Sequence, residues 1–388
     1  MKKLFRNIHL YLSLAAGIFI MIACLTGSIM VFEDEINHFI HSERYYVEAK
    51  EKQLSLDVLI KTAATEGKNF KVANIKTYSD KNRSVEISIA APEEKAKGEV
   101  KNGQKPPQRG KGGVSLTVYI NPYNGKVLDV ENKRESFFKK VEMIHRFLLS
   151  RKEGVGHYIM SYSSFFFFFI LLTGLILWWP KNKAILKQRL KIKWNGTTKR
   201  LTHDLHIVTG FYTSVFLIVI VMTGLVMSFN WINKGIFTLT GSSTESPKPP
   251  QSQLKEIGYH NLPYNKLQTI LTANFQDAES VNIRMPKEEK DAISVNVSYH
   301  HDSPNKSDTY YLDQYSGKIL GQLAFADKNI GQKIRSYIKP IHTGEVFGLT
   351  SKIINFIIVL LTLTFPVTGV MMWLNRIKKK KKKVGEAF

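Results

Sequence analysis

The chain has 388 residues and a formal net charge of +23 at pH 7, values that in a soluble protein would suggest two or three domains and a nucleic-acid partner. Four long runs without a charged residue exclude that class, because each can cross the roughly 30 Å apolar core of a bilayer. The runs are Leu10–Phe32, Tyr158–Pro180, Ile207–Asn233 and Ile353–Asn375. The single cysteine, Cys24, lies in the first run and excludes an intrachain disulfide or a thiolate zinc site.

The basic residues are concentrated on one side of the predicted membrane helices. Segment 181–200 holds eight Lys or Arg and no acid, and the tail from Arg376 holds six further lysines. Because positive flanks mark the cytoplasmic face, we predict a multi-pass protein of the cytoplasmic (inner) membrane with both termini inside. This charge accounts for orientation and solubility without nucleic acid, and the lysine-rich tail can also contact anionic lipid of the bilayer. The first run is followed by acids and lacks an Ala-x-Ala site, which indicates an uncleaved anchor.

The two halves of the chain repeat a pattern of histidines and Thr-Gly pairs. His9 precedes Gly27 by 18 residues, and His206 precedes Gly224 by the same number. Since 18 residues make about five helical turns, each histidine and its glycine face one side of a helix. Before the second and fourth runs stand His145 and His342, and these runs contain the pairs Thr173-Gly174 and Thr368-Gly369. We therefore predict a tandem repeat of span, outer module and span.

Each outer segment is predicted to form a small α+β module. A helical stretch at 54–66 precedes strands at 85–89 and 116–120, and a helical stretch at 264–275 precedes strands at 293–297 and 309–312; each module ends in a glycine-containing hairpin. Segment 92–113 has almost no large apolar residues and is predicted to be a disordered insertion. The fold class is thus membrane α-helical, with four transmembrane helices and two extracytoplasmic α+β modules.

These features give the following domain boundaries. We predict the first transmembrane helix in 1–36, the first module in 37–140, the second helix in 141–182, a cytoplasmic loop in 183–200, the third helix in 201–234, the second module in 235–340, the fourth helix in 341–376 and a basic cytoplasmic tail in 377–388.

Several motifs together resemble those of the PepSY-associated transmembrane family. They are Arg6-x-x-His9, His145-Arg146-Phe-Leu, Thr173-Gly-Leu-x-Leu-Trp-Trp-Pro180, Asp204-Leu-His206-x-x-x-Gly210, Pro340-Ile-His342-Thr-Gly-Glu-x-Phe-Gly348 and Thr368-Gly-x-x-x-Trp373. Members of this family include iron-regulated inner-membrane proteins and ferric-siderophore reductases. The resemblance implies four helices, two PepSY-like modules and, in the reductase members, b-type haem held by histidines. The chain departs from the pattern by its basic insertion and by a longer gap between His145 and the second span.

The topology sorts the four repeated histidines into two depths. His9 and His206 lie at the inner ends of their spans, whereas His145 and His342 lie at the outer side. Haem iron takes one or two axial imidazoles, and the core of a four-helix bundle can enclose the macrocycle. We therefore predict two b-type haems, one ligated by each pair, which together form an electron path across the bilayer. Arg146 is outside, where the orientation rule does not explain it, and can pair with a haem propionate.

Other readings of these residues remain open. A histidine at a helix end can simply lie at the headgroup level, and His203 and His157 are weaker alternative ligands. The Thr-Gly pairs suit either close helix packing or packing against a porphyrin. The remaining histidines have no repeat counterpart or belong to the outer modules: His38, His41, His260, His300 and His301.

Three functions are compatible with the sequence. The first is a haem-b electron-transfer protein, with the ferric siderophore as acceptor on the evidence of the resemblance alone. Because no dinucleotide or P-loop fingerprint is present, it needs an electron donor, either a cytoplasmic reductase or quinol. The second is a membrane-anchored regulatory protein whose PepSY modules bind a peptide or a protease without redox activity. The third is transition-metal handling by His203-Asp204-x-His206 and His300-His301-Asp302.

Overall fold

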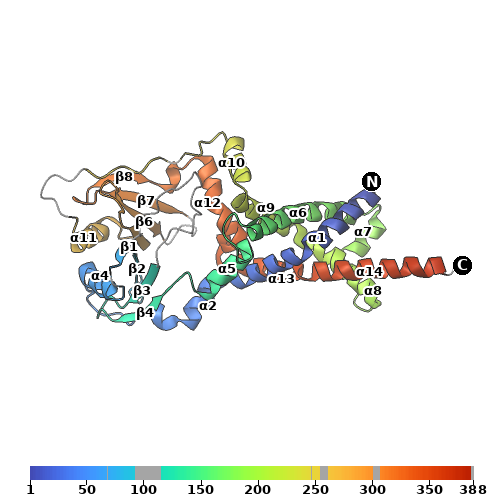
Figure 1. The fold of residues 1–388 in the computed structure, drawn as a ribbon, viewed down its shortest axis with the longest axis horizontal. Coiled ribbons are helices and arrows are strands. Elements are labelled where there is room, and N and C mark those ends of the chain that lie inside the picture. The colour runs from blue at the N-terminus through green and yellow to red at the C-terminus, as the bar shows by residue number, and fades with distance from the viewer. Residues whose placement is uncertain (68, 92–114, 246, 254–260, 300–305, 386–388) are drawn as a thin grey trace, which may run out of the picture. The chain divides into compact units, whose positions relative to one another are not determined.

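The computed structural model describes residues 1–67, 69–91, 115–245, 247–253, 261–299 and 306–385. The chain divides into two compact units, each assembled from distant parts of the sequence (Figure 1). The membrane unit comprises residues 1–33, 140–244 and 330–388, and the sheet unit comprises 34–139 and 245–329. The predicted insertion at 92–113 lies outside the described residues.

The membrane unit is helical, and four of its stretches are long and apolar enough to cross a bilayer, as the sequence predicts. These stretches are Lys2–Met30, Val155–Trp178, Thr198–Ser228 and Glu345–Lys378. The helices named in this part of the chain are α1 (Lys2–Met30), α5 (Phe137–Phe147), α6 (Val155–Trp178), α7 (Lys183–Arg189), α8 (Thr198–Asp204), the π-helix η1 (Leu205–Thr209), α9 (Gly210–Ser228), α10 (Asn230–Leu239), α12 (Ile330–Thr343), the 3₁₀-helix η3 (Glu345–Phe347), α13 (Gly348–Thr362) and α14 (Thr364–Gly385).

Two of the spans are not single regular helices, which the apolar runs do not reveal. The third changes from α8 to η1 and then to α9 around His206. The fourth breaks at Leu363, between α13 and α14. Pro366 follows in the first turn of α14, and because proline has no N–H it cannot donate to the carbonyl of Thr362.

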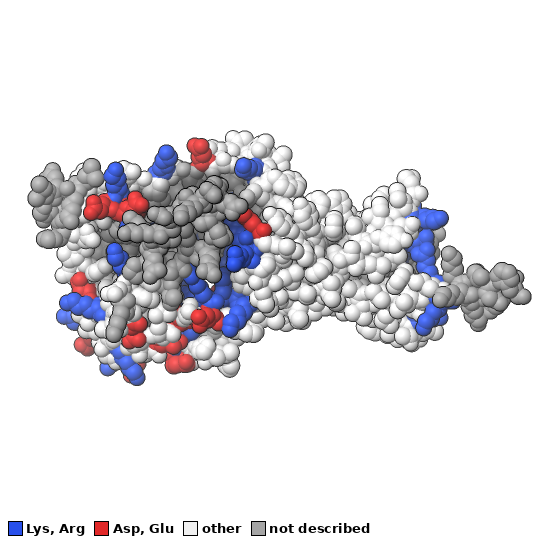
Figure 2. All heavy atoms as spheres, viewed as in Figure 1, with Lys and Arg blue, Asp and Glu red and all other residues white. Residues whose placement is uncertain are grey.

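The charged side chains of the membrane unit lie toward its two ends. Both chain termini lie at one end, here called the terminal end (Figure 1). Lys and Arg side chains gather there, and the surface along the helices shows none in this view (Figure 2). The other end, here called the opposite end, carries the C-terminus of α1 together with α5 and α12. This distribution fits a bundle with an apolar middle.

The interior of the bundle consists of apolar clusters between its two ends. Ala16, Ile20 and Cys24 of α1 pack with Ile170 and Val359. A second cluster joins α6, α9 and α13 and consists of Leu171, Leu217, Val221, Leu225 and Ile358. Four of the five consecutive phenylalanines, Phe165–Phe168, pack against these clusters, while Phe169 is 40% exposed. The phenylalanine run is therefore mainly core material.

The sheet unit joins both predicted modules into one eight-stranded antiparallel sheet of order β4-β3-β2-β1-β5-β6-β7-β8. The strands are β1 (Lys71–Tyr78), β2 (Val85–Ala90), β3 (Ser115–Ile120), β4 (Val127–Glu131), β5 (Ala278–Arg284), β6 (Ile293–Tyr299), β7 (Ser307–Leu312) and β8 (Ile319–Leu323). The helices are α2 (Glu33–Ile40), α3 (Ser42–Tyr45), α4 (Leu56–Thr65), the 3₁₀-helix η2 (Phe325–Asp327) and α11 (Tyr264–Asn274). The sequence analysis predicts neither β1 nor β5, whose pairing, with Ile75 opposite Ile283, connects the halves.

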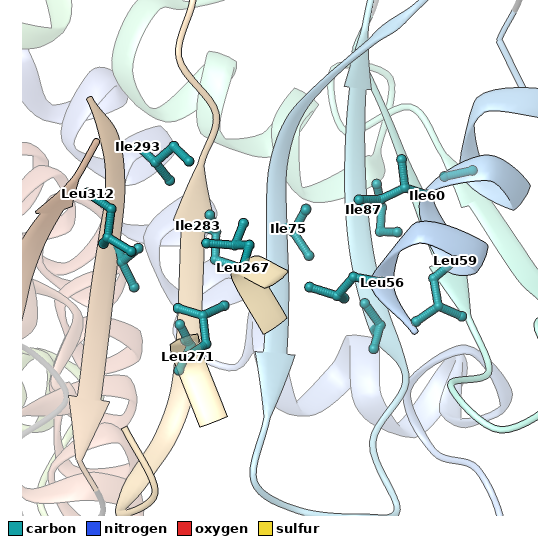
Figure 3. Packing of buried hydrophobic residues seen from close by; sticks show 14 of the residues in the cluster. Leu56, Leu59, Ile60, Ile75, Ile87, Leu267, Leu271, Ile283, Ile293 and Leu312 are labelled. Atoms are coloured by element: carbon teal, nitrogen blue, oxygen red, sulfur yellow. The ribbon is translucent and has the colours of Figure 1, made fainter. Parts of the chain in front are cut away.

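Helices α4 and α11 supply the apolar side chains that cover one face of this sheet (Figure 3). Leu59 of α4 and Leu267 of α11 are 1% exposed, and Ile75, Ile87 and Ile283 beneath them are fully buried. Each half ends in a hairpin whose glycine has positive φ, Gly125 at 71° and Gly317 at 77°. The left-handed conformation explains the glycine in both predicted turns.

Asp313, in the second of these turns, gives the sheet unit an acid-sensitive contact. Its carboxylate accepts hydrogen bonds from the backbone N–H of Gln253 (2.8 Å), Tyr315 (3.0 Å) and Ser316 (2.8 Å). Burial alone would raise the pKa of this carboxyl, but the hydrogen bonds led by Ser316 outweigh burial and lower it. The stabilisation is therefore complete above the unfolded-state pKa of about 3.9 and is lost as pH falls through the lower folded-state pKa.

We expect Asp313→Ala to destabilise this hairpin by about 1–3 kcal/mol at neutral pH, because several backbone donors lose their acceptor. Amide exchange of β7 and β8 in the full-length protein measures the effect. Asp313→Asn keeps one acceptor oxygen but cannot titrate. The faster amide exchange of β7 and β8 that we expect in the wild type below about pH 4 should therefore be absent in this variant. An unchanged acid response in Asp313→Asn would show that another group is responsible.

Candidate functional site

The four repeated histidines form two pairs inside the membrane unit. The ring centres of His9 and His206 are 6.4 Å apart, and those of His145 and His342 are 6.3 Å apart. All four side chains are half-buried. We call these the terminal-end pair and the opposite-end pair. The structure thus brings together the histidines that the sequence repeat matches, although their role as ligands stays a prediction.

Each imidazole is held by a threonine of a Thr-Gly pair on another helix. Nδ1 of His9 lies 3.1 Å from Oγ1 of Thr173, and Nδ1 of His206 lies 2.8 Å from Oγ1 of Thr368. At the opposite end the same contacts join His145 to Thr26 (3.0 Å) and His342 to Thr223 (3.1 Å). Each of the four Thr-Gly pairs that the repeat matches is used once.

The carbonyl three residues before each threonine fixes the protonation of the ring. Nδ1 of His9 donates to Ile170 (3.0 Å), that of His145 to Ala23 (3.0 Å) and that of His342 to Ile220 (2.9 Å). For His206 the backbone of Phe365, again three residues before the threonine, is the corresponding neighbour. Because a carbonyl oxygen can only accept, Nδ1 must carry the proton in a neutral ring. The lone pair is then on Nε2, the nitrogen free to bind a metal.

The threonine hydroxyl can act as the second acceptor because its own proton is engaged within its helix. Oγ1 of Thr173 donates to Phe169 (2.7 Å) and Oγ1 of Thr26 donates to Ile22 (2.6 Å). The equivalent bonds of Thr223 and Thr368 run to Val219 and Thr364. The histidine N–H therefore meets two oxygen acceptors that are both rigidly placed.

The glycine after each threonine makes room for the ring. A Cβ atom at Gly224 would lie 3.1 Å from Cε1 of His342, and one at Gly27 would lie 3.3 Å from Cε1 of His145. At the terminal end the corresponding distances are 3.3 Å for Gly174 and His9 and 3.6 Å for Gly369 and His206. The glycines therefore face histidine rings of other helices, a contact that the sequence interpretations did not include, and porphyrin packing stays a prediction.

The π-helix η1 surrounds His206 in the third span. Such single-turn bulges insert one residue into an α-helix and rotate the residues that follow, often at functional sites. The sequence analysis places His206 and Gly224 on one side of a helix by assuming that the helix is regular between them. The bulge shows that this assumption is wrong. Gly224 instead contacts His342, a residue of the other pair.

The other candidate residues occupy different contacts. Arg146 Nη1 lies 2.8 Å from Oε1 of Glu142 on its own helix, and its side chain is 49% exposed. His203 Nδ1 is 3.3 Å from the fully buried carboxylate of Asp204. His157 Nδ1 accepts from the backbone N–H of Glu153 at 3.3 Å. The structure therefore does not bring His203 or His157 into either pair by any contact among the described residues.

Neither pair belongs to a larger cluster of metal-binding side chains in the part of the chain that the structure describes. No three or more His, Cys, Asp or Glu side chains there gather so as to hold a metal ion. His300, His301 and Asp302, part of the metal-handling hypothesis, lie outside the described residues. Metal–imidazole bonds are about 2.0–2.1 Å long, so two imidazoles on opposite sides of one ion place their ring centres about 6.3 Å apart, and closer when the angle between the ligands is smaller. Both observed separations suit an ion that receives its other ligands from elsewhere.

The sequence analysis missed the threonines and carbonyls that position the histidines. A signal for them exists: 119 residues separate Thr26 from His145, and 119 separate Thr223 from His342. This equality survives although the outer segments between them differ in sequence. It links the Thr-Gly pairs of the first and third spans to histidines on other helices.

Comparison with known proteins agrees with this architecture. The family model described as "PepSY-associated TM region" matches residues 6–376, nearly the whole chain. None of the curated proteins matches the chain. The matched range includes all four histidines, all four Thr-Gly pairs and the whole sheet unit.

Proposed function

Because the chain belongs to the PepSY-associated transmembrane family, we propose that it is a haem-b electron-transfer protein of the cytoplasmic membrane. In this proposal the terminal-end pair holds one haem near the cytoplasmic face and the opposite-end pair holds another near the outer face. The acceptor outside is a ferric siderophore or another ferric chelate, and reduction of its iron serves iron acquisition.

The observation that carries the proposal is that each site pairs two imidazoles, and no third His, Cys, Asp or Glu among the described residues joins either pair. A bare transition-metal ion usually needs three or four protein ligands. Haem iron receives four nitrogens from the porphyrin and needs only axial ligands. Two ring centres separated by 6.4 Å or 6.3 Å, each ring with Nδ1 bonded to a carbonyl, fit that requirement.

The residues of the chain would then do three things. The carbonyl and threonine oxygens orient each imidazole and increase the electron density on its Nε2, as outer-shell acceptors do for metal-bound histidines. The glycines allow the rings to lie close to the helix backbone. The apolar clusters between the pairs exclude water. Thr26 marks the level of the opposite-end pair on α1, and the rise from His9 to Thr26 along this helix is roughly 25 Å. A bound haem supplies reversible Fe(III)/Fe(II) chemistry.

The reaction transfers one electron to each ferric ion. The acceptor goes from Fe(III) to Fe(II), and the electron comes from a quinol or from a cytoplasmic reductase, which is oxidised. Fe(II) is a softer ion than Fe(III), so a chelator with hard oxygen donors binds Fe(II) less tightly. The positive flanks at the terminal end support an orientation with this end in the cytoplasm.

Rapid mixing of the dithionite-reduced protein with ferric chelates tests the reductase role. We expect the haem absorption to return to the oxidised form while Fe(II) appears in equal amounts. The same chelators loaded with Ga(III), which cannot be reduced under these conditions, should leave the reduced spectrum unchanged. Reduced protein that no ferric chelate reoxidises would contradict this function, and a preparation without haem would favour the peptide-binding alternative.

A further inference from the structure

The opposite end of the membrane unit carries more positive charge than its predicted orientation explains. At this end the first and third spans finish and the second and fourth begin, and the neighbouring parts of the membrane unit are 140–157, 229–244 and 330–352. They contain three acids, Glu142, Glu153 and Glu345, and nine bases: Lys140, Arg146, Arg151, Lys152, Lys234, Lys333, Arg335, Lys339 and Lys352. The two ranges of the sheet unit, by contrast, contain 28 Lys or Arg and 26 Asp or Glu. The excess is therefore specific to this end of the membrane helices.

Membrane orientation works against this excess. Short outer loops close to transmembrane helices normally carry few Lys or Arg, because such residues favour the cytoplasmic side. With both termini in the cytoplasm, the opposite end faces outward. The orientation rule therefore does not account for the bases at this end.

Five of these nine bases lie on α5 and α12, the helices that carry the opposite-end pair: Lys140, Arg146, Lys333, Arg335 and Lys339. Arg146 is adjacent to His145 on α5, and Lys339 precedes His342 on α12 by about one turn. Lys352 on α13 is 7% exposed and lies about one turn before Asn355. The Nδ2 of Asn355 donates to the backbone carbonyl of His342 at 3.1 Å. The charge is thus built around the pair.

Several of these bases can attract an ion from solution. Lys140, Arg151, Lys152 and Lys339 are exposed. Of the three acids nearby, Glu142 is bound to Arg146 at 2.8 Å. A cluster of one sign near a low-dielectric surface raises the local concentration of opposite charges and their association rate by about 10–10³-fold, with steep dependence on salt.

We infer that the acceptor at the opposite-end pair is an anionic ferric chelate, of the catecholate or carboxylate class, in preference to a neutral or cationic hydroxamate chelate. This inference rests on the proposed function, since it names the substrate class of that site. It does not need the haem for binding, so the two can be tested apart.

Binding of redox-inert Ga(III) complexes to the full chain in nanodiscs of neutral phosphatidylcholine tests the inference. The trianionic Ga(III) tricatecholate should bind at least about ten-fold more tightly than the neutral Ga(III) trishydroxamate at low salt. This preference should decrease as the ionic strength approaches about 1 M, where the Debye screening length is about 3 Å.

The variant Lys140→Gln/Lys152→Gln/Lys339→Gln should lose most of the affinity for the tricatecholate and keep that for the trishydroxamate. The matched control is Lys187→Gln/Lys191→Gln/Lys193→Gln, which removes three exposed charges at the terminal end and should leave both affinities unchanged. An unaltered elution volume in size exclusion shows that either variant is folded.

Equal affinity for the two complexes, or no effect of the opposite-end variant, overturns the inference. So does an opposite-end variant that only reduces co-purified anionic phospholipid, because the bases would then serve lipid headgroups. Tricatecholate binding that depends on these lysines in a protein without haem would uphold the anion site and refute the proposed function. Haem reoxidation by neutral and anionic ferric chelates at equal rates and affinities would uphold the function and refute the anion preference.

Discussion

Replacing His9 with alanine is expected to reduce the haem content of the purified protein from two per chain to one. His9 and His206 are the only imidazoles that the described structure brings together at the terminal end, with ring centres 6.4 Å apart. Removal of one axial ligand leaves a haem that no covalent bond retains. The opposite-end pair, which uses different helices, should keep its own haem and its spectrum.

Pyridine haemochrome analysis against protein concentration measures this loss, and His206→Ala should give the same result. The matched control is His203→Ala, three residues from His206, whose ring contacts Asp204 instead and whose removal should leave two haems. In liposomes that enclose a reductant, His9→Ala should also abolish reduction of an external ferric chelate. Full haem content in His9→Ala, or loss of a haem in His203→Ala, would show that the terminal-end ligand is misassigned.

The second large effect is expected from a single methyl group at Gly224. A Cβ there would lie 3.1 Å from Cε1 of His342, closer than ordinary packing allows. The ring cannot easily move away, because its Nδ1 is held by Ile220 at 2.9 Å and by Thr223 at 3.1 Å. Overpacking of this kind typically costs about 1–3 kcal/mol, so Gly224→Ala should weaken haem binding at the opposite end about ten-fold or more.

Gly369 supplies the matched control for this prediction. A Cβ at Gly369 would lie 3.6 Å from Cε1 of His206, an ordinary van der Waals distance, so Gly369→Ala should keep both haems. Haem transfer to apomyoglobin measures how firmly each variant retains the cofactor. The redox titration of Gly224→Ala should change at one centre only. Equal behaviour of the two alanine variants would mean that the glycines do not act through contact with the rings.

The sequence predicts the parts of this structure that depend on local pattern. The four spans follow from long apolar runs, and the two histidine levels follow from the direction of the helices and the repeat. Helices α4 and α11 and strands β2, β3, β6 and β7 follow from periodicity and turn residues. His9 is matched to His206 because each precedes a Thr-Gly glycine by 18 residues. This equality is visible in a single sequence.

The parts that were missed depend on contacts between distant segments. The Thr-Gly pairs receive histidines from other helices, and spacing within one helix cannot reveal that. Strand β1 lacks clear alternation, and its pairing with β5 is decided by the tertiary fold. The bulge at η1 and the break at Leu363 leave the apolar runs intact, so hydropathy does not detect them. Arg146 also contacts Glu142 on its own helix, and its pairing with a haem propionate stays a prediction.

The absorption spectrum and haem stoichiometry of the purified full-length protein test most directly whether the two imidazole pairs each hold an iron porphyrin. We predict two b-type haems per chain, with a Soret band that halves in His9→Ala or His145→Ala and disappears in the double variant. A wild-type protein without a Soret band, or a double variant that keeps it, would contradict the account.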